Sequence, residues 1–247
     1  MNNYSPNDSI IQQTGAKVQT YMSQVYGWMS VGLALTGFMA WYASTNTNIL
    51  NLLFTIEHGY GYSYISGLSF FSWMLIIAQF GLVFVLSGMI TRLSGTAATT
   101  LFMLYSLLTG LTLTSVFIVY TASSIASVFF ITAGMFAALA FYGYTTKRDL
   151  SGLGRFLFMG LIGIVLASLV NIFMQSTEVM WAITYIGVFV FAGLTAYDTQ
   201  KLKMFGERLP TDDANMFRRF VILGALTLYL DFINLFIMLL RILGDRR

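Results

Sequence analysis

The sequence predicts an all-α polytopic membrane protein, built as a bundle of seven transmembrane helices. The chain of 247 residues is 57% hydrophobic but only 9% charged, and its mean hydropathy is +0.75. Soluble proteins carry about 25% charged residues, so much of this surface must face lipid rather than water. The chain also contains seven apolar runs, each long enough to cross a bilayer, which takes about 20 helical residues.

Polar residues occupy positions 1–22, which are expected to form a short N-terminal tail because they lack the basic-then-apolar order of a cleavable signal. Residues 23–244 are expected to form a single transmembrane domain, followed by a short basic tail at 245–247. The runs do not alternate, so helices rather than barrel strands would satisfy their backbone groups in lipid. They lie near residues 25–44, 70–90, 97–120, 124–144, 156–174, 179–197 and 220–243.

Basic residues are concentrated in alternate connections, which indicates the orientation of the chain. We expect the face that carries them, together with the N-terminus, to be cytoplasmic. Seven full crossings place the C-terminus and its three arginines outside, against this rule, so a re-entrant last segment or an even number of spans is an alternative. The basic residues of the cytoplasmic face are Lys17, Arg92, Lys147, Arg148, Arg155, Lys201, Lys203, Arg208, Arg218 and Arg219.

Composition also excludes several classes of protein. Cysteine is absent and His58 is the only histidine, which excludes disulfides, thiolate zinc sites and histidine metal clusters. All lysines lie in tails or connections, so a retinal protein, which needs a lysine within a span, is excluded as well. The net charge of +3 is explained by the basic cytoplasmic face. We therefore expect the lipid bilayer, and not nucleic acid, as a partner.

Two of the ten acidic residues do not fall in tails or connections. Asp231 lies inside the last run, where an aspartate costs about 2.5 to 3.5 kcal/mol on insertion scales. Thr227 and Asn234 share its side of the helix, so this polar stripe is expected to face the bundle interior. An ion or proton site is the favoured interpretation of Asp231, and a protonated carboxyl group with a structural hydrogen bond is the alternative. Asp198 closes the sixth run, where an interfacial acid is an equally good interpretation.

The two acids form a specific site if they meet across the sixth and seventh helices. Two carboxylates in a poorly hydrated site resist joint ionisation, so such a pair shares a proton and responds to pH. A hard cation such as Ca²⁺ also suits paired carboxylates supplemented by an amide oxygen, for which Asn234 is the nearest candidate. Spacing alone leaves open whether Asp198 and Asp231 meet, because a long connection separates them.

Rows of small and polar residues in the fifth run indicate contacts between helices. Close helix packing is the favoured interpretation of both rows. The lining of an ion path, with Asn171 as its candidate, is the alternative. The rows consist of Gly160, Gly163 and Ala167, and of Ser168, Asn171 and Gln175.

Three long segments resemble the signature segments of the bacterial Bax inhibitor-1 family, also called the transmembrane BAX inhibitor motif family. They read YGYTTKRDLSGLGRFLFMGLIGI at residues 142–164, LTAYDTQKLK at 194–203 and GALTLYLDFINLFIMLLRILG at 224–244. The similarity runs from QTYMSQVYGWM at residues 19–29 almost to the C-terminus, and it points to the YbhL-like branch. Agreement of this length is far more specific than a short motif.

The resemblance implies a seven-helix bundle in the bacterial inner membrane, with the seventh helix at its centre. It also implies a pH-sensitive leak for Ca²⁺, the transported ion, without a cofactor or an enzymatic activity. The gating and ion-binding pair of the family corresponds to Asp198 and Asp231, and Arg92 corresponds to the arginine that latches this pair. Arg92 is equally well explained as a positive-inside anchor. Gln79 stands where many members of the family carry an acidic residue, which puts an additional ion ligand at this position in doubt. Gln79 and Thr227 are therefore candidates only for polar positions along the ion path.

Two other functions compete with a leak. A YD on one helix and an Asp on the next also occur in intramembrane aspartyl proteases, but Asp231 stands in LYLD rather than in the GxGD motif of that class. The stronger alternative is a protein that transports nothing. Relatives of the YccA type are associated with the membrane-bound protease FtsH, so the chain would then regulate such a quality-control protease or be its substrate.

Overall fold

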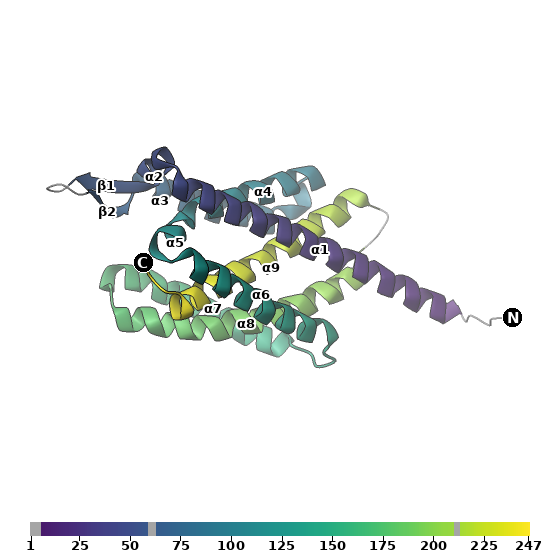
Figure 1. Cartoon of the computed structure of the whole chain (residues 1–247). Coiled ribbons are helices and arrows are strands. Elements are labelled where there is room, and N and C mark those ends of the chain that lie inside the picture. Colours follow the sequence, from purple (N-terminus) through teal and green to yellow (C-terminus); the bar gives the residue numbers. More distant parts are fainter. Residues whose placement is uncertain (1–5, 59–62, 210–212) are drawn as a thin grey trace. The chain divides into compact units, whose positions relative to one another are not determined.

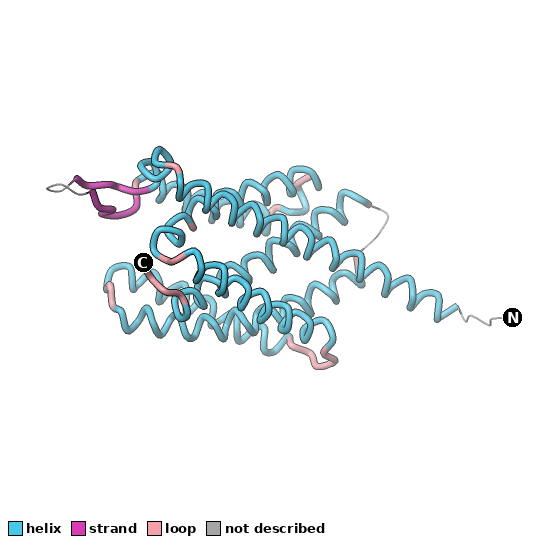
Figure 2. Tube along the Cα trace, in the orientation of Figure 1, coloured by secondary structure: helices cyan, strands magenta, loops and turns pink. Residues whose placement is uncertain are grey.

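A computed structural model of the chain describes residues 6–58, 63–209 and 213–247. Residues 1–5 of the expected N-terminal tail lie outside the described residues. The described part is almost entirely helical, with one small two-stranded sheet (Figure 1). Most helices are joined by short connections (Figure 2).

The helices differ widely in length, and the two strands follow one another in the chain. The helices are α1 (Pro6–Thr45), α2 (Thr47–Leu53), α3 (Phe70–Gly88), α4 (Gly95–Thr112), α5 (Thr114–Val119), α6 (Ala122–Thr145), α7 (Ser151–Met174), α8 (Thr177–Arg208) and α9 (Ala214–Leu243), with a 3-10 turn at Ile90–Arg92. The antiparallel strands are β1 (Phe54–His58) and β2 (Ser63–Leu68).

Six helical segments of the described chain are long and apolar enough to cross a membrane, and α4 and α5 together form one of them. The prediction of an all-α polytopic membrane protein is therefore confirmed. α1 is not among the six segments, although it contains the first predicted run. Glycine, tyrosine and tryptophan residues interrupt that run and lower its hydropathy.

Large aromatic side chains remain exposed along the membrane-crossing helices. A surface of this kind in water would be unfavourable, whereas lipid chains cover it without cost. The most exposed aromatic residues are Phe70, Phe80, Phe84, Phe130, Phe141, Phe173 and Phe189. These faces therefore meet the bilayer.

The chain divides into two compact units, each of which is described by itself. The first unit comprises Met1–Tyr26, Ser123–Pro210 and Gly224–Asp245. The second comprises Gly27–Ala122, Thr211–Leu223 and Arg246–Arg247. α1 and α9 are each divided between the two units.

Glycines in the first unit allow α8 to approach its neighbours closely. A Cβ atom on Gly143 of α6 would collide with the backbone carbonyl of Ala196 in α8. A Cβ atom on Gly154 of α7 would lie 2.5 Å from the Tyr197 ring of α8. Because no side chain fits at these points, the backbone of α6 packs directly against that of α8, and the backbone of α7 packs against the Tyr197 ring.

α9 has the largest buried share of the six candidate spans, with 61% of its apolar window buried. In the first unit it packs against α6 through aromatic rings. The Phe232 ring lies 5.4 Å from Phe129 and 5.5 Å from Phe136, between ring centres. Met238 of α9 fills the space beside Gly187 of α8. This packing explains why α9 is apolar on nearly every side.

The C-terminal end of α9 lies beside the beginning of α6. The Ser124 hydroxyl donates to the Asp245 carboxylate at 3.2 Å, and the Asp245 N–H donates to the Ser124 hydroxyl oxygen at 3.0 Å. α6 and α9 therefore run in opposite directions, and the end of α9 is far from the connection between α6 and α7 at residues 146–150. This arrangement favours a full crossing by α9 over a re-entrant segment.

In the second unit, α1 packs on α4 and the connection after α1 is structured. The Thr36 hydroxyl donates to the Ser106 carbonyl at 2.8 Å, and a Cβ on Gly110 would lie 2.7 Å from the Thr36 carbonyl oxygen. The connection, which the sequence leaves without an element, folds into α2 and the β1–β2 hairpin. Asn46 begins α2 by accepting the N–H groups of Asn48 and Ile49 with its side chain.

Two arginines at the beginning of α9 hold the turn between α3 and α4 within the second unit. Arg218 Nε donates to the Thr99 hydroxyl at 3.0 Å. Arg219 Nη1 donates to the carbonyls of Thr91 and Leu93, at 2.6 and 3.2 Å. These two basic residues thus have a structural role beyond marking the cytoplasmic face.

Candidate functional site

Asp231 is a buried acid that lies well inside α9. Its side chain is only 5% exposed, and its Oδ2 atom has no hydrogen-bond partner among the described residues. Buried polar atoms are nearly always hydrogen-bonded, so an orphaned carboxylate oxygen calls for a proton, a water molecule or an ion. The surrounding turns of α9 are largely apolar, which makes an acid at this position costly to keep for structure alone.

Asp198 lies on α8 and faces the same region of the first unit. Its side chain is half-buried. The carboxyl groups of Asp198 and Asp231 lie close enough to interact electrostatically. The structure thus brings together the two acids whose meeting the sequence leaves open.

Lys201 is a basic residue that interacts electrostatically with Asp198. It lies one helical turn beyond Asp198 on α8, and its charge acts on the Asp198 carboxyl group. Residues three apart on a helix share a face, so the spacing of Asp198 and Lys201 in the sequence already indicates that they are neighbours. From the sequence alone, Lys201 serves only as one of the basic residues that indicate orientation.

Arg92, the expected latch, belongs to the second unit. It ends the 3-10 turn between α3 and α4, and its side chain is exposed. The acid pair belongs to the first unit, so the latch remains a prediction.

Asn234 and Thr227 flank Asp231 on α9, as the helical spacing predicts. Both are half-buried. The Asn234 Nδ2 group donates to the Leu230 carbonyl at 2.8 Å, which fixes the side chain along its own helix. Its amide oxygen can accept a hydrogen bond or contact a cation.

Gln79 and Asn171, the other two residues predicted to line an ion path, make hydrogen bonds that hold neighbouring segments together. Gln79 belongs to the second unit, where its amide ties α3 to α4: Nε2 reaches the Leu108 carbonyl at 3.5 Å, and Oε1 accepts from the Thr109 hydroxyl at 3.4 Å. Asn171 accepts the Ser176 N–H at 3.0 Å and so holds the turn between α7 and α8. That turn precedes α8, roughly 30 Å from Asp198 at 1.5 Å per residue.

The rows on α7 contribute less to packing than the sequence suggests. A Cβ on Gly160 would lie 3.2 Å from Val190 of α8, whereas Gly163 is exposed and has open space beside it. Gln175 ends α7 with a left-handed φ of 51° and belongs to the turn. Only part of each row therefore faces another helix.

The acid pair offers few oxygen ligands to a cation. Ca²⁺ takes six to eight oxygen ligands, often with several carboxylates. The described residues contain no group of three or more acidic or histidine side chains that could hold a metal.

Fold and site together define a class: a multi-pass membrane protein with an ionisable pair between two of its helices. The sequence matches the family described as "Inhibitor of apoptosis-promoting Bax1" over residues 18–247. The chain therefore belongs to the Bax inhibitor-1 family, as the resemblance of its signature segments predicts.

Similar proteins agree with this assignment. The chain is 62% identical to the inner membrane protein YbhL of Escherichia coli (strain K12), over 100% of both chains. It is 44% identical to a protein of Borreliella burgdorferi over 92% of each chain. It is 39% identical to a protein of Deinococcus radiodurans, over 95% of this chain and 94% of the relative. The chain is a multi-pass protein of the inner membrane.

Proposed function

We propose that the chain is a pH-sensitive calcium leak of the inner membrane, gated by protonation of the Asp198–Asp231 pair. The observation that carries the proposal is the orphaned oxygen of Asp231, buried inside a membrane-crossing helix and within electrostatic reach of a second acid. Each proton that the pair gains or loses changes the charge between α8 and α9. Such a change biases the packing of the two helices and the attraction of a cation.

The proposal includes α1 as a further crossing, which makes α9 the seventh and central span. α1 is 40 residues long, about twice what a bilayer requires. With α1 counted, the basic connections alternate as the positive-inside rule expects. The large buried share of α9 supports its central place. Arg92 would then approach the pair from the cytoplasmic end of α3 and stabilise its ionised form.

Calcium flux into liposomes tests the proposal. Purified full-length protein should carry Ca²⁺ down its gradient without ATP, at a rate that depends on pH. Asp231→Asn and Asp198→Asn keep the size of each side chain but remove its titration, so each should abolish the pH response. Asp213→Asn is the matched control, because Asp213 caps α9 by accepting the Met216 N–H at 2.9 Å and asparagine caps equally well.

Two outcomes would contradict the proposal. Flux that keeps its full pH response in both Asn variants would exclude the pair as the gate. Wild-type protein that carries no Ca²⁺ at any pH would exclude the leak and leave the regulator of a membrane-bound protease as the function to test.

A further inference from the structure

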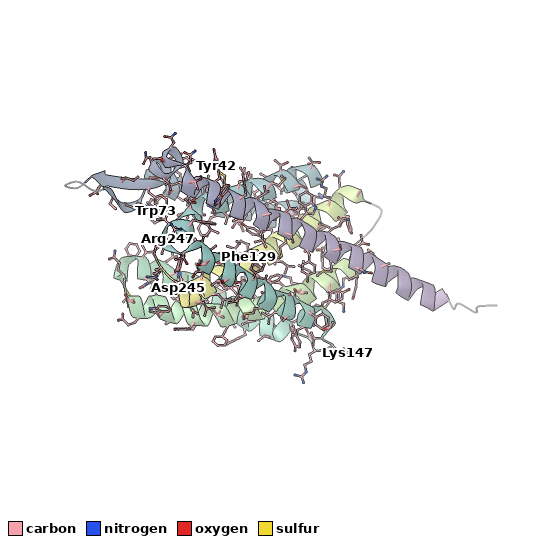
Figure 3. All side chains as sticks on the ribbon, viewed as in Figure 1. Tyr42, Trp73, Phe129, Lys147, Asp245 and Arg247 are labelled. Atoms are coloured by element: carbon pink, nitrogen blue, oxygen red, sulfur yellow. The ribbon has the colours of Figure 1, made fainter. Side chains whose placement is uncertain are left out.

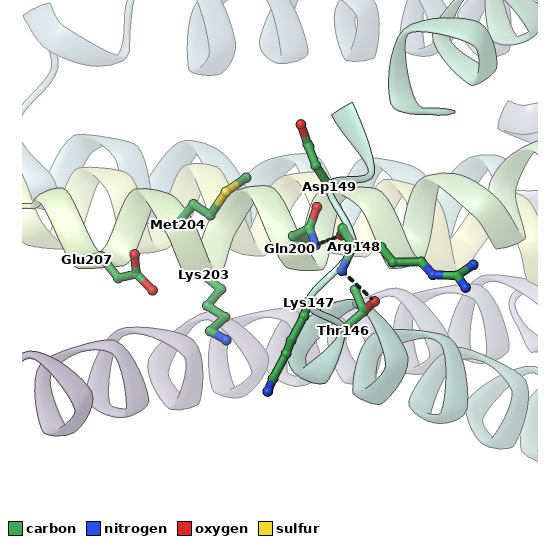
Figure 4. A pocket seen from close by; sticks show the side chains of 9 residues that line it. Thr146, Lys147, Arg148, Asp149, Gln200, Lys203, Met204 and Glu207 are labelled. Carbon is green, nitrogen blue, oxygen red and sulfur yellow. Dashed lines mark hydrogen bonds between the residues drawn. The ribbon is translucent and has the colours of Figure 1, made fainter. Parts of the chain in front are cut away.

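The connection between α6 and α7 and the last turns of α8 enclose a pocket of about 220 Å³ in the first unit. This is several times the roughly 30 Å³ that one water molecule occupies. Figure 4 shows one wall formed by the connection and the other by a single face of α8. The lining residues with basic, hydroxyl or amide groups are Thr146, Lys147, Arg148, Gln200 and Lys203.

Gln200 makes the pocket a built structure rather than a loose surface. Its side chain is buried, its Oε1 atom accepts the Leu150 N–H at 2.9 Å, and its Nε2 group donates to the Arg148 carbonyl at 2.8 Å. The Arg148 N–H in turn donates to the Thr146 hydroxyl at 3.2 Å. The connection is therefore held in one position against α8.

Lys203 is also fixed in place. Its ammonium group donates to the Tyr144 carbonyl at 2.9 Å and lies 4.9 Å from the centre of the Tyr144 ring. An ammonium group has three N–H donors, so two are left for a ligand. The side chains of Lys147 and Lys203 extend in the same direction in Figure 4. Figure 3 shows Lys147 reaching out from the end of the helices.

The pocket lining has three basic side chains and two acidic ones, Asp149 and Glu207, so a net positive charge remains. Asp149 accepts the Ser151 N–H at 2.8 Å, and hydrogen bonds from Ser151 hold the pKa of Asp149 below its ordinary value. Its carboxylate therefore binds at the beginning of α7, where the N–H groups of the first turn attract negative charge. Glu207 lines the opposite end of the wall and is exposed to solvent.

The position of the pocket indicates the source of its ligand. It lies where two membrane-crossing helices meet their connection, and α8 is 32 residues long, so its last turns extend past the hydrocarbon core. Phe141, two residues before Gly143 of the pocket lining on α6, and Phe156, in the second turn of α7, are 70% and 67% exposed. A molecule with a phosphate group and acyl chains would contact the lysines and these rings together.

We propose that this pocket binds the phosphate group of an anionic membrane lipid, with the acyl chains lying along the exposed faces of α6 and α7. Basic pockets between membrane helices on the cytoplasmic side are suited to such headgroups. Lys147 and Lys203 supply the charge, the Thr146 hydroxyl supplies a donor, and Gln200 positions the connection that carries two of these groups. The site is independent of the acid pair and of calcium transport.

Native mass spectrometry of the purified full-length protein tests the site by counting bound lipids during titration. Phosphatidylglycerol, which is anionic, should bind at least ten-fold more tightly than zwitterionic phosphatidylcholine. The double variant Lys147→Gln/Lys203→Gln should lose this preference, and Lys147→Gln alone should weaken it several-fold without disturbing the bond from Lys203 to Tyr144. The matched control is Arg208→Gln, an exposed residue at the end of α8 outside the pocket, which should bind like wild type.

Several results would overturn the proposal. Unchanged phosphatidylglycerol binding in both lysine variants would exclude the pocket, and an equal loss in Arg208→Gln would indicate a diffuse charge effect. A lysine variant whose unfolding midpoint equals that of wild type but whose lipid preference is intact would also contradict it. Inorganic phosphate that binds where phosphatidylglycerol does not would assign the pocket to a soluble anion instead.

Discussion

Gln200 ties the connection between α6 and α7 to α8 with one side chain. Both ends of its amide are used, one by the Leu150 N–H and one by the Arg148 carbonyl. Leu150 is itself buried, so its N–H group has no access to water if the partner is lost. The position of the connection between α6 and α7 therefore depends strongly on this residue of α8.

We expect Gln200→Ala to destabilise the protein by about 1 to 3 kcal/mol, because it leaves a buried backbone donor without a partner. The free energy of unfolding in mixed micelles measures the effect. Glu207→Ala, an exposed residue on the same wall of the pocket, is the control and should change stability by less than about 0.5 kcal/mol. Equal stability of Gln200→Ala and wild type would show that water replaces the amide.

Asp231 can be predicted from the sequence, whereas its surroundings cannot. An aspartate inside an apolar run is conspicuous because of its insertion cost, and helical spacing correctly places Thr227 and Asn234 beside it. The approach of Asp198 depends on how two separate helices pack, which no local pattern encodes. The same limit applies to Asn171 and Gln79, whose hydrogen bonds to a turn and to α4 no local pattern predicts.

At the scale of elements, the close contact between α6 and α8 depends on the absence of a side chain at Gly143. The Ala196 carbonyl occupies the space that a Cβ atom would need. A backbone atom cannot move aside like the end of a flexible side chain, so the helices must separate to admit even a methyl group.

We therefore expect Gly143→Ala to cost about 1 to 3 kcal/mol of stability through overpacking. Gly134→Ala on the same helix is the matched control, since a Cβ atom at that position would meet nothing within 4 Å. There alanine should be neutral or stabilise α6 by up to about 1 kcal/mol, because it favours the helix over glycine. Thermal unfolding of the two variants should therefore shift in opposite directions, and equal shifts would contradict the contact.

Element boundaries are predictable where hydropathy changes sharply and not elsewhere. α1 begins well before its apolar run, because polar residues are compatible with a helix that extends beyond the bilayer. The hairpin of β1 and β2 lies in a connection whose short strands have weak alternation. The third run bends at Leu113 into α4 and α5, and no proline or glycine marks that position.

At the scale of the whole chain, the direction of α9 determines the side of the C-terminus. Asp245 is bonded to Ser124 at the beginning of α6, whereas the basic connection lies at the end of α6. The C-terminal end of α9 thus lies at the opposite end of α6 from Lys147 and Arg148. If both helices cross the bilayer, we expect the C-terminus on the other side from this basic connection. The positive-inside rule tolerates such an exception, because it counts the bias of all connections together.

Labelling of single cysteines tests this topology, and the natural absence of cysteine makes each variant unambiguous. A membrane-impermeant maleimide should label Lys147→Cys only in inverted vesicles and Arg247→Cys only in intact spheroplasts. Labelling of both from the same side would mean that α9 does not cross the bilayer.

The glycine contacts also determine which part of the first unit is free to move. Gly143 lets the backbones of α6 and α8 touch, whereas Gly154 and Gly193 bring α7 against α8 through the Tyr197 ring and the Leu157 side chain. The contacts of α9 with α6 and α8 include Phe232 and Met238, whose side chains can rotate. We therefore expect any motion that separates Asp198 from Asp231 to displace α9 rather than to part α8 from α6.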